Sequence, residues 1–156
     1  LAVAARSGHL RRNFQGYTDD TCDVLIGLGA SSISKFPQGY AQNASGTAIY
    51  QAAVRAGEMA TGRGHAFKGE DLLRARMIEM LMCDFRIDGA ALIAEYGITS
   101  ARLAELYAPV VESFGNMVRV DGPDFEVEPE GRALSRLIAR GFDGYEMRAE
   151  GHSSAI

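Results

Sequence analysis

Two glycines and a row of small polar residues directly follow a short apolar run near the start of the chain. The run is Val24-Leu25-Ile26, and the sequence continues through Gly27-Leu28-Gly29 to Ser31-Ser32. A run of this length bounded by turn formers predicts a buried strand over residues 23–29, of parallel type. Glycine lets a backbone approach a bound molecule closely, and α/β sheets present ligand loops at the carboxyl ends of strands. We therefore expect small-molecule chemistry within residues 11–43.

Other residues with binding chemistry are not spaced as ligands. Gly27-x-Gly29 alone lacks the third glycine of a dinucleotide fingerprint. Asp19, Asp20 and Asp23 lie close together, which we interpret as a solvated turn and not as a metal cluster. The histidines are scattered and the cysteines form no C-x-x-C pair; they are His9, His65, His152, Cys22 and Cys83. We expect no metal site.

Composition limits the class of protein. The chain has 156 residues, 47% of them hydrophobic and 23% charged, which suits one globular domain, or slightly more, without disulfides. The net charge of −4 argues against a nucleic-acid partner. No run is long enough to span a membrane, no signal peptide is visible, and the sparse cysteines fit a cytoplasmic protein with reduced thiols. Because the chain starts at Leu1 without a methionine, we expect it to be the tail of a longer protein.

The sequence pattern beyond residue 43 is that of a helical domain. Periodicity and caps predict helices over residues 47–61, 69–85, 88–96, 100–114 and 131–142, with a hairpin over 116–129. Leu73, Met77, Leu81 and Phe85 form the clearest core stripe, and the nearby methionines are expected to fill the core. The predicted fold class is mostly α with minor β, with one domain at residues 1–43 and a second at 44–156.

The order of three helices, a hairpin and a closing helix is that of a winged-helix module. A DNA-reading module needs basic residues on its recognition helix and wing. Residues 100–114 offer only Arg102, and the wing carries Asp121, Asp124, Glu126 and Glu128. One hypothesis is therefore a stand-alone winged-helix module that binds a protein.

Three motifs follow one another within residues 11–43: RRNFQGYT, then DVLIGLGASSIS and GYAQN. In these motifs the chain resembles the oxygen-independent coproporphyrinogen III oxidases, which are radical S-adenosylmethionine enzymes of haem biosynthesis. MLMCDFRID and EPEGRALSRLIARGFDGY extend the resemblance over essentially the whole chain. It implies a partial (β/α) barrel with a 4Fe-4S cluster and two S-adenosylmethionines, followed by a helical, winged-helix-like domain. It also implies oxidative decarboxylation of two propionates of coproporphyrinogen III to vinyl groups, giving protoporphyrinogen IX.

The chain departs from that family pattern in one decisive respect. The C-x₃-C-x₂-C motif that holds the cluster is absent, and Cys22 and Cys83 cannot replace it. The chain is thus expected to be a carboxyl-terminal part, with residues 23–29 as the last barrel strand and the amino-terminal barrel missing. On its own it should be inert, with no catalytic residue and no bound cofactor.

The resemblance reaches four site positions. It implies that Ile33 lies against the first S-adenosylmethionine and that Gln15 lies near the second. Gly27 and Gly29 would permit the close backbone approach. Without the resemblance, Ile33 would also be compatible with plain core packing beside a strand end.

Overall fold

The computed structural model of the chain describes residues 1–145. These residues form six α-helices and eight strands in three antiparallel sheets, so the fold is mixed α/β. The prediction of a mostly helical chain with one hairpin therefore missed two of the three sheets. Two compact units, Leu1–Leu72 and Leu73–Ile156, divide the chain. No helix among residues 1–145 is both long and apolar enough to cross a membrane.

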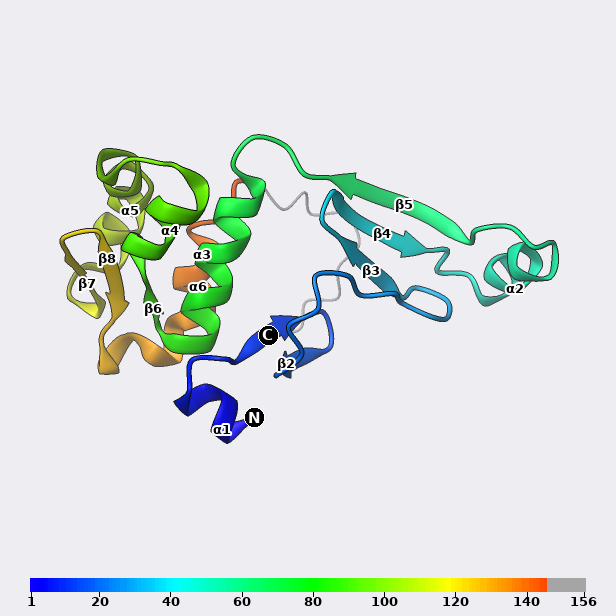
Figure 1. Cartoon of the computed structure of the whole chain (residues 1–156), viewed down its shortest axis with the longest axis horizontal. Coiled ribbons are helices and arrows are strands. Elements are labelled where there is room, and N and C mark those ends of the chain that lie inside the picture. Colours follow the sequence, from blue (N-terminus) through cyan, green and yellow to red (C-terminus); the bar gives the residue numbers. More distant parts are fainter. Residues whose placement is uncertain (146–156) are drawn as a thin grey trace. The chain divides into compact units, whose positions relative to one another are not determined.

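The first unit combines short strands with the helices α1 and α2 (Figure 1). Strands β1 and β2 form a hairpin, and the second sheet has the order β3-β4-β5. A turn over residues 36–39 joins β3 to β4, where Phe36 pairs with Gly39. The elements of this unit in chain order are α1 (Ala2–Arg6), β1 (Arg11–Asn13), β2 (Gly16–Thr18), β3 (Ile33–Phe36), β4 (Gly39–Asn43), α2 (Thr47–Arg55) and β5 (Thr61–Ala66).

Helix α2 is shorter than predicted and contributes nothing to a core. It ends at Arg55, none of its residues is buried, and Ile49 is 66% exposed. Residues 61–66 form strand β5 instead, which pairs along β4. This pairing extends the first unit beyond residue 43, the predicted domain boundary, to Leu72. Where the domains of a longer parent protein divide stays a prediction.

The buried parallel strand predicted at residues 23–29 is not formed. Only Leu25 pairs with the sheet, through an antiparallel bridge to Lys35 whose two N···O distances are 3.0 and 2.9 Å. Val24, Ile26 and Leu28 are 46%, 58% and 84% exposed. The prediction failed because, among the described residues, the segment meets a strand on one edge and for one residue only.

The second unit is helical with a small sheet of order β6-β8-β7. Side chains cap two of its helices, since Asp88 accepts from the Ala91 N–H at 2.9 Å and Thr99 from the Arg102 N–H at 3.2 Å; the Thr99 cap was predicted. The elements are α3 (Asp71–Asp84), β6 (Arg86–Ile87), α4 (Gly89–Tyr96), α5 (Ser100–Phe114), β7 (Val118–Asp121), β8 (Asp124–Val127) and α6 (Ser135–Arg140), with 3₁₀ turns at Gly115–Met117 and Pro129–Leu134. The first helix begins at the end of the first unit.

A single apolar core holds the second unit together. The rings of Tyr107, Phe125 and Phe142 contact one another with centroid distances of 5.2, 6.1 and 5.4 Å, and all three are buried. The predicted α3 stripe faces this core: Leu73, Met77 and Leu81 are buried, and Phe85 is half-buried against it. Met80 and Met82 are also core residues, as expected. In the closing helix we expected Leu134, Leu137 and Ile138 to face the core, but Leu137 is 53% exposed while Ile138 is buried.

Candidate functional site

The β3-β4-β5 sheet sorts its side chains onto two faces. Directly paired residues share a face, as do residues two apart along a strand. One face, which we call the Ile33 face, therefore carries two rows of side chains, which the strand registers define as Ile33, Gln42 and Arg63, and then Lys35, Tyr40 and His65. A hydrogen bond of 2.6 Å from Arg63 Nε to Gln42 Oε1 runs along the first row.

Ile33 lies where the glycine segment meets the sheet. A Cβ added to Gly27 would lie 2.7 Å from the Ile33 carbonyl oxygen and 2.9 Å from the Ile33 nitrogen. Real Cβ atoms do not approach backbone that closely, so residue 27 must be glycine for this packing to form. The structure thus joins two of the predicted site residues. The close approach allowed by Gly27 is an approach to the Ile33 backbone.

The loop that follows Gly27 is fixed by side chains from the sheet and from α2. The Gly27 N–H donates to Ser34 Oγ at 3.0 Å, and the Gly29 N–H donates to the Tyr50 hydroxyl at 3.0 Å. Asn43 Nδ2 donates to both glycine carbonyls, at 3.1 Å for Gly27 and 2.9 Å for Gly29. The polar backbone groups of both glycines are therefore already bonded within the protein. These residues shape the loop beside Ile33.

Backbone conformation explains the second glycine of the loop. Gly29 has φ +104°, a value that L-amino acids with side chains rarely adopt. Ser31, two residues on, has φ +64°. Its carbonyl accepts from Gln42 Nε2 at 2.8 Å, and its N–H donates to the Ala44 carbonyl at 3.1 Å, which holds this less common conformation in place.

The other predicted cofactor residue, Gln15, lies at the tip of the β1–β2 hairpin and is exposed. Asn13 Oδ1 accepts from the Gln15 and Gly16 N–H groups at 2.8 and 3.2 Å, which forms the tight turn. Phe14 packs edge-on against Tyr40 of the Ile33 face, with 5.0 Å between ring centroids. The hairpin that carries Gln15 therefore rests on the same face as Ile33.

An aromatic row and one histidine complete the Ile33 face. Phe67 packs edge-on against Tyr40 at 4.9 Å and lies 6.3 Å from the His65 ring. The Nε2 atom of His65 is 3.2 Å from Asp71 Oδ2, and the same oxygen accepts from the Lys68 N–H at 2.8 Å. Of the three histidines, His9 is exposed and His152 lies outside the described residues.

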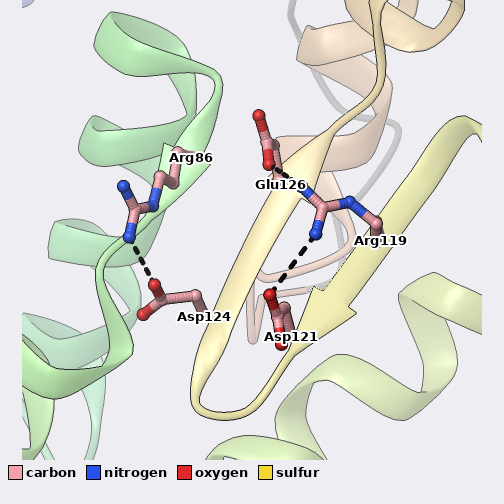
Figure 2. A pocket seen from close by; sticks show the side chains of 5 residues that line it. All are labelled: Arg86, Arg119, Asp121, Asp124 and Glu126. Carbon is pink, nitrogen blue, oxygen red and sulfur yellow. Dashed lines mark hydrogen bonds and ion pairs between the residues drawn. The ribbon is translucent and has the colours of Figure 1, made fainter.

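A charged hollow of about 220 Å³ lies on the small sheet of the second unit (Figure 2). Arg86 pairs with Asp124, which also accepts from the Gly89 N–H at 2.9 Å. Burial alone would raise the pKa of Asp124, but these hydrogen bonds and the Arg86 charge together lower it. Arg119 pairs with Glu126. The last residue that lines the hollow is Asp121, whose Oδ2 atom is 3.6 Å from Arg119 Nη1. Both arginines of the hollow are held in ion pairs with its carboxylates, so the hollow ties strands together and shows no chemistry of its own.

The described residues do not fit an iron–sulfur cluster. They contain no group of three or more His, Cys, Asp or Glu side chains placed to hold a metal ion. Cys22 is exposed in the first unit and Cys83 is buried in the second. A hydrogen bond to Asp20 raises the pKa of the Cys22 thiol, which disfavours the thiolate that a metal requires. The neighbouring Asp23 belongs to the acidic turn, which we expected to bind no metal.

Sequence reasoning missed the residues that build the loop. Ser34, Asn43 and Tyr50 were not singled out, although their contacts decide the shape of residues 27–29. No signal was available from the sequence, because strands β3 and β4, which carry Ser34 and Asn43, were not predicted, and a polar side chain demands a partner only once its burial is known. Ser34 is only 8% exposed and its partner is the Gly27 N–H.

Comparisons with known proteins agree on one group of enzymes. No protein-family model matches the chain. An oxygen-independent coproporphyrinogen III oxidase of Paracoccus denitrificans is 55% identical over 156 residues, which cover 100% of this chain and 35% of that protein. A second, from Cereibacter sphaeroides, is 50% identical over 156 residues, or 99% of this chain and 34% of that protein. The chain thus spans about a third of the length of the curated relatives it matches.

A solved structure matches the fold as well as the sequence. It is that of the coproporphyrinogen III oxidase of Escherichia coli, described as a radical SAM enzyme. The TM-score is 0.79 and the identity 36%, over 93% of this chain and 34% of that one. The chain therefore has the fold of part of a radical SAM enzyme. It is homologous to the oxygen-independent coproporphyrinogen III oxidases, as the wording of residues 11–43 predicted.

Proposed function

We propose that this chain is the carboxyl-terminal part of an oxygen-independent coproporphyrinogen III oxidase. The complete enzyme would oxidatively decarboxylate two propionates of coproporphyrinogen III to vinyl groups, giving protoporphyrinogen IX in the cytoplasm. The observation that carries the proposal is the 55% identity to the Paracoccus denitrificans enzyme along the whole chain. That identity includes the first unit as well as the helical one, which favours an enzyme part over a stand-alone winged-helix interaction module.

In the complete enzyme, residues 23–29 would be the last strand of the barrel. The exposure of Val24, Ile26 and Leu28 supports this assignment, because a strand with apolar side chains at consecutive positions, as at residues 24–26, is suited to burial on both faces. The remaining two thirds of the parent protein would supply the covering strands. The second unit, with its helices and the β7–β8 hairpin, would be the winged-helix-like domain.

The complete enzyme would use a 4Fe-4S cluster and S-adenosylmethionine, which together supply a 5′-deoxyadenosyl radical. The cluster would be held by cysteines outside this chain. Ile33 would offer an apolar wall to one S-adenosylmethionine and Gln15 a polar contact to the other, while Gly27 and Gly29 keep the loop beside Ile33 in shape. The common location of Ile33 and the Gln15 hairpin on one sheet face supports this arrangement.

A chimera tests the proposal directly. The matching third of the Paracoccus denitrificans enzyme is replaced by this chain, and the anaerobic conversion of coproporphyrinogen III is followed under reducing conditions. We expect protoporphyrinogen IX from the chimera and none from the same enzyme truncated at the junction. A folded chimera that holds its cluster and cleaves S-adenosylmethionine but leaves the substrate unchanged would refute the proposal.

The chain by itself provides a second test. Reconstituted anaerobically with iron and sulfide, it is expected to hold no stoichiometric cluster, because three thiolates at close spacing are needed and it has two distant cysteines. A reducible cluster of about four irons per chain would contradict the assignment of the cluster to the rest of the parent protein.

A further inference from the structure

The Ile33 face is the one surface of the β3-β4-β5 sheet that combines cations with aromatic rings. Lys35 and His65 lie on either side of Tyr40 in one row, and Arg63 lies in the next. None of the three strands contains an aspartate or a glutamate. Lys35 and Arg63 therefore give the face two cations, while His65 lies 3.2 Å from the Asp71 carboxylate and the chain as a whole carries a net charge of −4.

The charge of Arg63 is not neutralised by the hydrogen bond described above. Its Nε donates to Gln42 Oε1, the oxygen of a neutral amide. The residue is exposed, and Lys35 is half-buried at the opposite edge of the sheet. Adjacent strands lie about 4.8 Å apart, so the Lys35 and Arg63 strands stand roughly 10 Å apart with β4 between them. Two cations at that separation suit a ligand that carries more than one carboxylate.

The rings between the cations add a second requirement. Tyr40 occupies the middle strand, and Phe14 and Phe67 pack edge-on against it at 5.0 and 4.9 Å. Phe14 is 51% exposed, so part of this aromatic surface is accessible. Aromatic faces bind flat π-systems and apolar groups. A nearby cation strengthens binding when such a ligand carries carboxylates at its edge. The matching ligand is a flat, apolar body with carboxylates on its edge.

We propose that the Ile33 face binds the propionate carboxylates of a tetrapyrrole, with Lys35 and Arg63 as their cationic partners and Tyr40 against a pyrrole ring. This inference rests on the proposed function, and it assigns a location for the substrate. It places the propionates on the same face as Ile33, the residue proposed to contact S-adenosylmethionine. A propionate held there would lie beside Ile33 and so near the proposed S-adenosylmethionine site.

The experiment uses the full 156-residue chain and coproporphyrin III, the stable oxidised porphyrin with the same four propionates. Binding is measured by porphyrin fluorescence, and deuteroporphyrin IX, with two carboxylates, serves as the comparison ligand. We expect Arg63→Gln and Lys35→Gln each to weaken coproporphyrin III binding about 3- to 10-fold, the range for one partly exposed charge pair. Deuteroporphyrin IX should bind the unmodified chain more weakly than coproporphyrin III does, and the two substitutions should weaken its binding by a smaller factor.

Conservative and distant variants make the result specific. Arg63→Lys keeps the charge and should retain most of the affinity, whereas Arg136→Gln removes an exposed arginine from α6 and should change nothing. Unchanged binding in Arg63→Gln and Lys35→Gln, an equal loss in Arg136→Gln, or no porphyrin binding by the unmodified chain would each overturn the inference. If the chimera is active while these variants bind normally, only this inference fails. If the chimera is inactive but binding still depends on both cations, the proposed function fails and the porphyrin site remains.

Discussion

Replacing Gly27 by alanine should detach the glycine segment from strand β3. The added Cβ would lie 2.7 Å from the Ile33 carbonyl oxygen and 2.9 Å from both the carbonyl carbon and the nitrogen, so backbone must move. Overpacking of this kind costs about 1–3 kcal/mol. The adjacent bridge between Leu25 and Lys35 holds the segment with only two backbone hydrogen bonds, of 3.0 and 2.9 Å, so it should open first.

Native-state hydrogen exchange measures that opening. A loss of about 1–3 kcal/mol corresponds to roughly 5- to 150-fold faster exchange at the Leu25 and Lys35 amides, if they exchange through local opening. The amide of Leu103, in the core of the second unit, should be unaffected. Gly57→Ala is the matched control, because its added Cβ meets nothing within 4 Å and its positive φ of 74° strains only the end of α2. Equal exchange at Lys35 in Gly27→Ala and the parent chain would refute the steric explanation.

Three further predictions concern the core, the charged hollow and the cofactor wall. Phe125→Ala removes a fully buried ring and should cost about 3–5 kcal/mol, seen as a lower urea midpoint for the second unit by circular dichroism. The pKa of Asp124 is below its ordinary value of 3.8, so the stability that its ionised form contributes is present above pH 3.8 and is lost as the pH falls through the folded-state pKa. Asp124→Asn should therefore weaken the loss of unfolding free energy at acid pH. An unchanged loss would exclude the pairing of Asp124 with Arg86 as its cause. In the chimera, Ile33→Asp should abolish S-adenosylmethionine cleavage with cluster content kept, whereas Ile33→Val should be nearly silent, and normal turnover by Ile33→Asp would make Ile33 an ordinary packing residue.

Much of the second unit was predictable because its signals are local. The helix α3 stripe repeats every four residues, Asp88 and Thr99 cap their helices, and the Asp-Gly sequence at Asp121 marks the hairpin. Strand β6 was missed because it is two residues long, Arg86–Ile87, and exists only by pairing with β8. Leu137 was misplaced because a 3₁₀ turn precedes α6 and shifts the helical phase.

The first unit was predicted less well because its structure depends on distant pairing. Strand β5 has the sequence TGRGHA, without apolar alternation, and all six residues are exposed. It forms a strand because β4 offers a free edge, which no local pattern can reveal. Residues 23–29 show the converse error: an apolar run favours a buried strand, but most of that run remains uncovered here. The resemblance of residues 11–43 to the family motifs pointed to this region as the candidate site, although its strands were assigned incorrectly.

The candidate site depends on the register of β3 more than on any single residue. Along this strand, Ile33 and Lys35 point to one face, while Ser34 bonds to the Gly27 N–H. A slip of one residue would exchange the two sets, since side chains alternate with a period of two. It would remove the apolar Ile33 side chain and a cation from the Ile33 face and leave the part-buried Gly27 amide without its acceptor. The short turn to β4 and the two hydrogen bonds from Asn43 to the glycine carbonyls oppose that slip. The same contacts that fix the loop therefore fix which side chains the face presents.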